Sequence, residues 1–319
     1  MTAIHAEGLR KSYGEKQVLD GIDLRIPEAS VFALLGPNGA GKTTTVQILS
    51  TLISADGGEA RVAGHDLTRQ ADDVRRSIGV TGQFAAVDGL LTAEENLLLM
   101  ADLHHLGRAE GRRRAADLLA RFDLAAEAKK TAATFSGGMR RKLDLAMTLV
   151  GDPRIIFLDE PTTGLDPRSR RMLWELIRGL VEDRGITIFL TTQYLEEADQ
   201  LADRIAVLNG GRIVAEGTAE ELKRRIPGSH IRLRFAAEGQ LDAAAAVFDV
   251  AQSDPENLAL NVPGDGSPAT VRAVLDLLES AGVEAESLTV HTPDLDDVFL
   301  ALTGDGTSGT PLHMKETLR

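Results

Sequence analysis

The sequence predicts an α/β domain followed by a smaller α+β domain, and three observations lead to this prediction. The apolar run 31–35 ends in a glycine-rich loop, and a helical stretch at 43–52 follows. Strand, glycine loop and helix in this order open a phosphate-binding α/β domain. The apolar runs 155–158 and 186–190 have the length and composition of buried parallel strands. After Gly228 the pattern changes to strand–helix–strand–helix–strand over about 75 residues.

The individual elements follow from hydrophobic periodicity and turn residues. Strands are expected at 4–10, 18–26, 31–35, 61–64, 77–81, 155–158, 186–190, 204–208, 231–235, 258–262 and 284–290. Helices are expected at 43–52, 68–76, 136–150, 173–182, 195–202, 241–248 and 269–281. The segment from Thr92 to about residue 128 is also helical in pattern, and Thr92 and Glu95 have the spacing of a capping box. These elements predict domains at 1–225 and 229–303, with a disordered tail at 304–319.

Composition and charge exclude several classes of function. The net charge of −13 disfavours a nucleic-acid partner, because nucleic-acid binders usually carry a basic surplus. The chain has no cysteine, which excludes disulfides, thiolate nucleophiles and cysteine-bound zinc and fits a reducing cytosol. No stretch approaches the roughly 20 apolar residues of a membrane span, and no secretory signal is recognisable at the start. If the protein works at a membrane, we expect it to dock there through another chain.

The glycine-rich loop matches the phosphate-binding pattern G-x-x-x-x-G-K-[ST]. Its glycines let backbone N–H groups converge on phosphate oxygens, and the helix that follows adds its positive dipole end. We expect Lys42 to bind the β- and γ-phosphates and the Thr43 hydroxyl to bind Mg²⁺. The residues predicted to contact the nucleotide here are Gly36, Pro37, Asn38, Gly39, Ala40, Gly41, Lys42, Thr43 and Thr44.

Two adjacent carboxylates end the apolar run 155–158. Charged residues at the end of such a strand point into the crevice where α/β sheets bind ligands. Asp159 is therefore predicted to hold the Mg²⁺ shell, and Glu160 to act as the general base toward the attacking water. By itself the pair could equally be a solvated strand end; together with the phosphate loop it indicates a catalytic site.

A Ser-Gly-Gly run at a helix start offers a hydroxyl and free N–H groups to an anion, although many helix caps look the same. The order and spacing of all the motifs are more specific. They are the phosphate loop, Gln83, Ser136-Gly137-Gly138, Asp159-Glu160 and Gly164-Leu165-Asp166. In this respect the sequence resembles the ATP-binding-cassette family over roughly residues 1–225.

The resemblance implies a P-loop NTPase fold with a mixed sheet core, an antiparallel β subdomain and an α-helical subdomain at about 84–150. It implies that Tyr13 stacks on adenine and that Gln83 touches Mg²⁺ and water and senses a membrane subunit. Ser136, Gly137 and Gly138 would bind the γ-phosphate of an ATP held by a second copy of the chain. Asp166 would bridge the two copies. The preference for ATP also comes from the family.

Two positions differ from the family's usual pattern. The signature normally ends in Gln, where this chain has Met139, and the switch histidine is replaced by Gln193. Glutamine can donate a hydrogen bond to a γ-phosphate but carries no charge and shuttles no proton. We therefore expect Gln193 to take part in catalysis at a modest rate. Both departures, with the segments 193–199 and 295–299, resemble the daunorubicin/doxorubicin-resistance ATPases.

That subfamily implies a role in export. Two such ATPases pair with a separate membrane permease at the cytoplasmic face of the cell membrane and energise efflux of hydrophobic compounds, such as anthracycline-like antibiotics or lipids. Two other classes fit less well: an ATPase acting on DNA or the ribosome would carry a long coiled coil or two cassettes, and a non-catalytic module would lack Lys42 or Glu160. The C-terminal module either stabilises the pair, regulates it or is a plain structural appendage.

Overall fold

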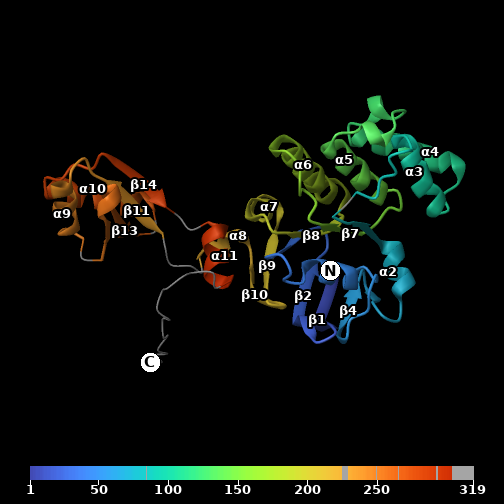
Figure 1. The fold of residues 1–319 in the computed structure, drawn as a ribbon, viewed down its shortest axis with the longest axis horizontal. Coiled ribbons are helices and arrows are strands. Elements are labelled where there is room, and N and C mark those ends of the chain that lie inside the picture. The colour runs from blue at the N-terminus through green and yellow to red at the C-terminus, as the bar shows by residue number, and fades with distance from the viewer. Residues whose placement is uncertain (84, 225–228, 249, 265, 292–293, 304–319) are drawn as a thin grey trace. The chain divides into compact units, whose positions relative to one another are not determined.

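The computed structural model describes residues 1–83, 85–224, 229–248, 250–264, 266–291 and 294–303. The tail at 304–319, predicted to be disordered, lies outside the described residues. The chain divides into two compact units, Met1–Ala219 and Glu220–Arg319 (Figure 1).

A six-stranded sheet forms the centre of the first unit, in the order β10-β9-β3-β8-β7-β6. Strands β9, β3, β8, β7 and β6 are parallel, and β10 pairs antiparallel to β9, so the sheet is mixed as predicted. Every residue of β3, β7 and β8 is buried, which explains their unbroken apolar sequences. The strands are β3 Val31–Leu35, β6 Ile78–Thr81, β7 Ile155–Asp159, β8 Thr187–Thr192, β9 Arg204–Asn209 and β10 Arg212–Gly217.

A four-stranded antiparallel sheet shares its core with the central sheet. Its order is β2-β1-β4-β5, and helix α1 (Lys42–Leu49) packs its buried side chains into the same core. Within this core the Phe32 and Phe189 rings stack at 5.7 Å. Burying each ring stabilises the fold by about 1.5–3 kcal/mol relative to an exposed ring. The strands are β1 Thr2–Tyr13, β2 Lys16–Pro27, β4 Gly57–Val62 and β5 His65–Asp66.

Helices α3, α4, α5 and α6 gather at the end opposite the antiparallel sheet, with β7 and β8 between, whereas α2 lies beside β4 (Figure 1). The predicted capping box is confirmed, since the Thr92 side chain accepts from the Glu95 N–H while Glu95 accepts from the Thr92 N–H. The helices are α2 Ala71–Ser77, α3 Ala93–Leu103, α4 Arg108–Arg121, α5 Gly137–Thr148, α6 Pro167–Arg184 and α7 Leu195–Leu201, with 3-10 turns at Ala125–Glu127 and Ala132–Thr134.

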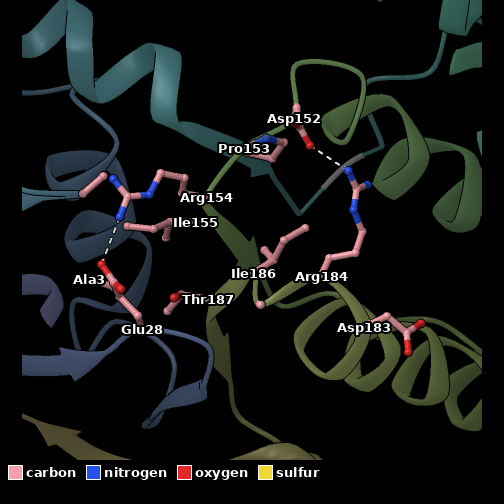
Figure 2. A pocket seen from close by; sticks show the side chains of 12 residues that line it. Ala3, Glu28, Asp152, Pro153, Arg154, Ile155, Asp183, Arg184, Ile186 and Thr187 are labelled. Carbon is pink, nitrogen blue, oxygen red and sulfur yellow. Dashed lines mark hydrogen bonds and ion pairs between the residues drawn. The ribbon is translucent and has the colours of Figure 1, made fainter. Parts of the chain in front are cut away.

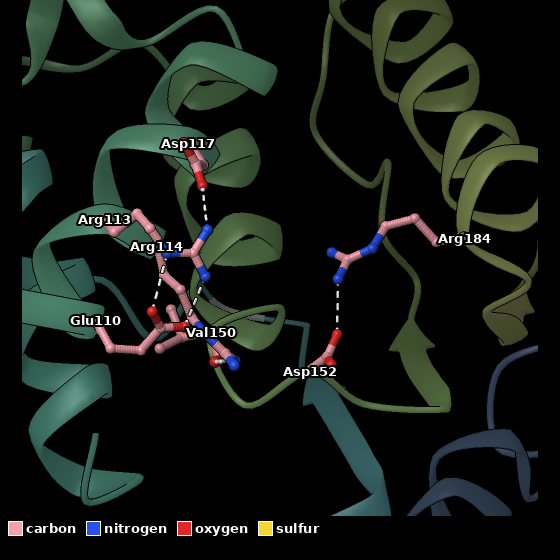
Figure 3. Close-up of polar contacts among 7 residues, drawn as sticks. All are labelled: Glu110, Arg113, Arg114, Asp117, Val150, Asp152 and Arg184. Atoms are coloured by element: carbon pink, nitrogen blue, oxygen red, sulfur yellow. Dashed lines mark hydrogen bonds and ion pairs between the residues drawn. The ribbon is translucent and has the colours of Figure 1, made fainter. Parts of the chain in front are cut away.

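One arginine, Arg114, attaches helix α4 to the loop that leads into β7 (Figure 3). Arg114 donates to the Val150 carbonyl at 2.8 Å and pairs with Glu110 at 2.7 Å. Hydrogen bonds from Arg113 and Arg114 lower the pKa of Glu110 to about 2. The contribution of ionised Glu110 to the free energy of unfolding is therefore complete above the ordinary pKa of a glutamate, and it is lost as the pH falls toward 2. Solvent screens these half-exposed charges, so the pairs add little stability, and both lie within α4. The bond from Arg114 to the Val150 carbonyl is the contact that holds α4 to the loop.

The second unit has its own antiparallel sheet, in the order β12-β13-β11-β14. Its core contains Ile231, Leu233 and Phe235, packed with side chains of helices α9 and α10. The elements are α8 Ala219–Arg224, β11 His230–Arg234, α9 Glu238–Ala245, β12 Gln252–Asp254, the 3-10 turn Pro255–Asn257, β13 Ala259–Pro263, α10 Pro268–Ser280, β14 Ser287–His291 and α11 Leu295–Thr303.

Some predicted boundaries are wrong, and some short elements were not predicted. Helix α6 begins at Pro167 rather than at residue 173, because Asp166 caps it by accepting from the Ser169 N–H and proline suits the first turn. The unpredicted elements β10, β12, α8 and α11 have 3 to 9 residues each. Strand β12 and helix α8 are too short to show a clear period, whereas β10 follows the Asn209-Gly210 turn, which is a hairpin signal that was overlooked.

Candidate active site

The phosphate loop joins the carboxyl end of β3 to helix α1. Gly41 precedes α1 with φ +111°, a conformation that L side chains rarely adopt. A Cβ on Gly41 would also lie only 2.6 Å from Leu19 Cδ2. Glycine is therefore required here by both the backbone conformation and the surrounding space. This lets the loop turn tightly enough to bring the N-terminus of α1 up to the sheet edge, where an anion is favoured.

Lys42, the first residue of α1, is 5% exposed and folds back over the loop. Its ammonium donates to the Gly36 carbonyl at 2.9 Å and the Pro37 carbonyl at 3.2 Å. It also lies 3.4 Å from Glu160 Oε1, and Glu160 is itself buried. The structure thus brings together two predicted catalytic residues from distant parts of the sequence and holds a positive charge at the phosphate loop.

Thr191 fixes the backbone and side chain of the acid pair. It lies on β8 directly opposite Asp159, the last residue of β7. Its hydroxyl donates to Asp159 Oδ1 at 2.5 Å, while the Glu160 N–H donates to the Thr191 carbonyl at 3.1 Å and approaches its hydroxyl at 3.2 Å. Thr191 was not among the site residues predicted from the sequence. The signal that could have identified it is a hydroxyl side chain near the end of a buried apolar strand.

Glu160 has a strained backbone. Its φ is +49°, which costs a non-glycine residue about 1–3 kcal/mol and persists only where the surroundings enforce it. Its carboxylate is held on two sides, by Lys42 at Oε1 and by the Thr163 hydroxyl, which donates to Oε2 at 3.4 Å. The strain therefore serves to direct this carboxylate at the phosphate loop rather than along the strand.

The two predicted glutamines lie at the same edge of the sheet. Gln83 follows the carboxyl end of β6 and is exposed, and Gln193 follows β8 directly and is half-buried. Because β6, β7 and β8 are parallel neighbours, both glutamines flank the strand that carries Asp159. Tyr13 lies on the other sheet, at the end of β1, and is 51% exposed.

The predicted signature residues occupy a different part of the unit. The Ser136 hydroxyl caps α5 by accepting from the Met139 N–H at 3.3 Å, and Ser136 and Gly137 are exposed. Gly138 lies so close to helix α6 that a Cβ would approach Ser169 Oγ to 2.6 Å. Among the described residues, no hydrogen bond or ion pair joins Ser136 or the two glycines to the phosphate loop.

Asp166 caps helix α6 at the surface. Its carboxylate accepts from the Ser169 N–H at 3.0 Å and from the Ser169 hydroxyl at 2.6 Å. The bond from the Ser169 hydroxyl lowers the pKa of Asp166 most, and the bond from the Ser169 N–H lowers it further. Within one copy of the chain the observed role of Asp166 is therefore to begin α6, and its exposed position leaves the predicted bridging role to be tested.

A cavity of about 460 Å³ lies at the opposite end of the sheet, beside the amino ends of β7 and β8 (Figure 2). Two ion pairs cross its walls, Arg154 with Glu28 at 3.0 Å and Arg184 with Asp152 at 2.6 Å. A third carboxylate of the lining, Asp183, pairs with Arg121. Open α/β sheets bind ligands at the carboxyl ends of their strands. By this rule the candidate nucleotide site is the region around Lys42, at the carboxyl end of β3, and this cavity is not part of it.

Three features define a P-loop nucleotide hydrolase: the mainly parallel sheet, the phosphate loop with its buried lysine after β3, and the acid pair at the end of β7, with β8 between the two strands. The model of the ABC transporter family matches residues 19–163. The daunorubicin resistance ATP-binding protein DrrA3 of Streptomyces coeruleorubidus is 50% identical, covering 95% of this chain and 96% of the relative. The daunorubicin/doxorubicin resistance ATP-binding protein DrrA of Streptomyces peucetius is 48% identical, covering 95% and 92%.

Among solved structures, the ADP conformation of an ATP-binding cassette of an ABC transporter matches with a TM-score of 0.63 and 25% identity, covering 69% of this chain and 92% of that one. The chain belongs to the ATP-binding-cassette family of transporter ATPases, in its daunorubicin/doxorubicin-resistance group. The predicted fold class and the predicted ATPase activity are confirmed. No helix in the described part of the chain is long and apolar enough to cross a membrane.

Proposed function

We propose that two copies of this chain clamp two Mg-ATP molecules and energise the export of hydrophobic compounds, such as anthracycline-like antibiotics or lipids, through a separate membrane permease at the cytoplasmic face of the membrane. The resistance proteins to which the chain is similar support the substrate class. The exposed leucines of the helical region offer an apolar surface for the permease. They are Leu90, Leu99 and Leu103, which are 87%, 44% and 64% exposed.

One observation carries the two-copy model: the groups proposed to bind phosphate lie in two separate places on the chain. Lys42 and Glu160 lie within 3.4 Å of each other, whereas Ser136 and Gly137 stand exposed at the N-terminus of the 12-residue helix α5. A helix N-terminus favours an anion, and here none of its bonds goes to the phosphate loop. A second copy can therefore present this end to the γ-phosphate, with Asp166 at the contact between the copies.

Oxygen donors at the sheet edge suit Mg²⁺, which prefers carboxylate, hydroxyl and amide oxygens. Asp159, Thr43 and Gln83 would hold the ion, which neutralises charge on the β- and γ-phosphates. In our proposal, Lys42 binds the phosphate oxygens and Glu160 takes the proton of the attacking water. The amide of Gln193 donates to the γ-phosphate, and Tyr13 stacks on the adenine.

We further propose that residues 229–303 form an accessory domain distinct from an ATP-binding domain at 1–225, whose helical subdomain spans about 84–150. The separate core around Ile231 and Phe235 supports an independent fold for this accessory domain. The three roles given above stay open: this domain stabilises the ATPase pair, regulates it or is a plain structural appendage.

A mixing experiment tests the shared site. Ser136→Arg should block hydrolysis while sparing ATP binding. Lys42→Ala should be inactive because its phosphate loop lacks the charge that binds the β- and γ-phosphates. In an equal mixture, half of the dimers contain one copy of each variant. In such a mixed dimer, the intact phosphate loop of the Ser136→Arg copy faces the intact Ser136 of the Lys42→Ala copy, so one of its two sites is complete. About a quarter of wild-type phosphate release should therefore return.

A second mixture is the matched control. Lys42 and Glu160 face each other at 3.4 Å within one chain, so both belong to the same half of a site. Mixing Lys42→Ala with Glu160→Gln should therefore restore nothing. If the Lys42→Ala and Ser136→Arg mixture also stays at the average of the separate variants, the two-copy model is wrong.

Gln193 gives a separate prediction. Gln193→Ala should lower kcat by about 10–100-fold, which corresponds to losing one hydrogen bond to a charged group. With glutamine at this position, activity should vary little between pH 6 and 7.5, whereas Gln193→His should introduce a pH dependence near about 6.5, the ordinary imidazole pKa. The measurement is kcat against pH for the three proteins. Unchanged hydrolysis in Gln193→Ala would remove this residue from the mechanism.

A further inference from the structure

A buried arginine on helix α5 holds the backbone on both sides of Glu160. Arg141 is 6% exposed, and its Nε donates to the Pro161 carbonyl at 2.8 Å. Its Nη2 donates to the Asp159 carbonyl at 3.4 Å. The strained residue between these two carbonyls is thus anchored by a side chain from a helix that lies outside its own strand and turn.

The same guanidinium also holds the segment that carries Gln83. Its Nη1 donates to the Gly82 carbonyl at 2.7 Å and lies 3.2 Å from Asp144 Oδ2. The other oxygen of Asp144 accepts from the Ala86 N–H at 2.9 Å. Arg141 and Asp144, one turn apart on α5, therefore fasten the backbone on both sides of Gln83.

We propose that Arg141, oriented by Asp144, is a positioning residue for hydrolysis that links the start of α5 to Glu160 and Gln83. Arg141 lies five residues after Ser136 on the same helix, about 7.5 Å along its axis. A shift of α5 therefore moves the guanidinium, and with it the backbone of both residues. The inference rests on the proposed role of Glu160 as general base.

Stability alone does not account for a buried pair at this position. Burial lowers the pKa of Arg141 and raises the pKa of Asp144, so both charges are held at a desolvation cost. Buried ion pairs are often no more stabilising than apolar side chains of similar volume. The arginine guanidinium carries five N–H donors in a rigid fork, so it can bond to carbonyls in separate segments. The lysine ammonium carries three donors on a single nitrogen.

The test compares three full-length variants in steady-state kinetics, ATP-binding measurements and thermal unfolding. Arg141→Met should lower kcat by about 10–100-fold, as misplaced catalytic groups do, while the Kd for ATP changes by less than about twofold. Arg141→Lys keeps the charge beside Asp144 but loses part of the fork, so its kcat should lie between those of Arg141→Met and the wild type. Asp144→Asn should likewise lower kcat more than it weakens ATP binding.

Arg114→Met is the matched control. Arg114 also combines an ion pair, with Glu110, and a bond to a backbone carbonyl, of Val150, but it lies on α4 away from the acid pair. It should leave kcat unchanged and lower Tm less than Arg141→Met does, because its ion pair is half-exposed. An unchanged kcat in Arg141→Met, or a kcat loss matched by an equal loss of ATP affinity, would overturn the proposal.

If Arg141→Met does not fold, the Arg141→Lys variant tests the positioning role instead. A kcat loss at a Tm within a few degrees of wild type supports positioning, and a wild-type kcat refutes it. Failure of the proposed function gives a different result, since Glu160→Gln would then hydrolyse ATP at the wild-type rate whatever Arg141 does.

Discussion

Glu160→Gln should lower ATP hydrolysis by about 10²–10⁴-fold, the usual contribution of a general base, while ATP binding is retained. The amide has the shape of the carboxylate and can still accept from the Thr163 hydroxyl, but it cannot take a proton from water. Because ATP then remains uncleaved between the two copies, the variant should also accumulate as a dimer. Phosphate release, ATP affinity and sedimentation velocity at saturating Mg-ATP measure the three effects.

The control is Glu182→Gln, which makes the same chemical change at an exposed position on α6. It should behave as the wild type in all three measurements. A Glu160→Gln variant that stays monomeric at saturating Mg-ATP would contradict the sandwich model, and one that hydrolyses ATP normally would contradict the assignment of the base.

Lys42→Ala should abolish ATP binding in the micromolar range. The substitution removes the charge that meets the β- and γ-phosphates, and charge-assisted hydrogen bonds contribute about 1.5–3 kcal/mol each. It also leaves the buried Glu160 carboxylate without its cation, and breaking a buried pair costs about 3–5 kcal/mol. Calorimetric titration with Mg-ATP and a thermal melt measure the two losses separately.

The double variant Lys42→Ala/Glu160→Gln separates binding from stability. Glutamine removes the unpaired charge, so Tm should recover toward the wild-type value while ATP binding remains lost. Tight ATP binding by Lys42→Ala would refute the assignment of the phosphate loop. A Tm that does not recover in the double variant would show that the 3.4 Å pair is not the source of the destabilisation.

The central strands could be predicted from the sequence because burial on both faces leaves an unbroken apolar run. The run 31–35 coincides with β3, and the runs at 155 and 186 lie within one residue of the starts of β7 and β8. Strand β10 was missed, although the Asn209-Gly210 turn after the predicted strand 204–208 is a hairpin signal and β10 pairs antiparallel with β9 across it. Helix α6 was predicted too short because a capping aspartate and a proline at its start were not recognised as a helix beginning.

The phosphate loop and the acid pair are recognisable in the sequence because their residues are neighbours along the chain, and the family follows from the order and spacing of the motifs. How these residues are held depends on contacts that form only in the folded chain. Thr191 meets Asp159 through strand pairing, and Arg141, which in sequence belongs to an ordinary basic run on a helix, is buried against three backbone carbonyls. Such contacts join segments far apart in the chain, and local residue patterns carry no information about which distant backbone a side chain will reach.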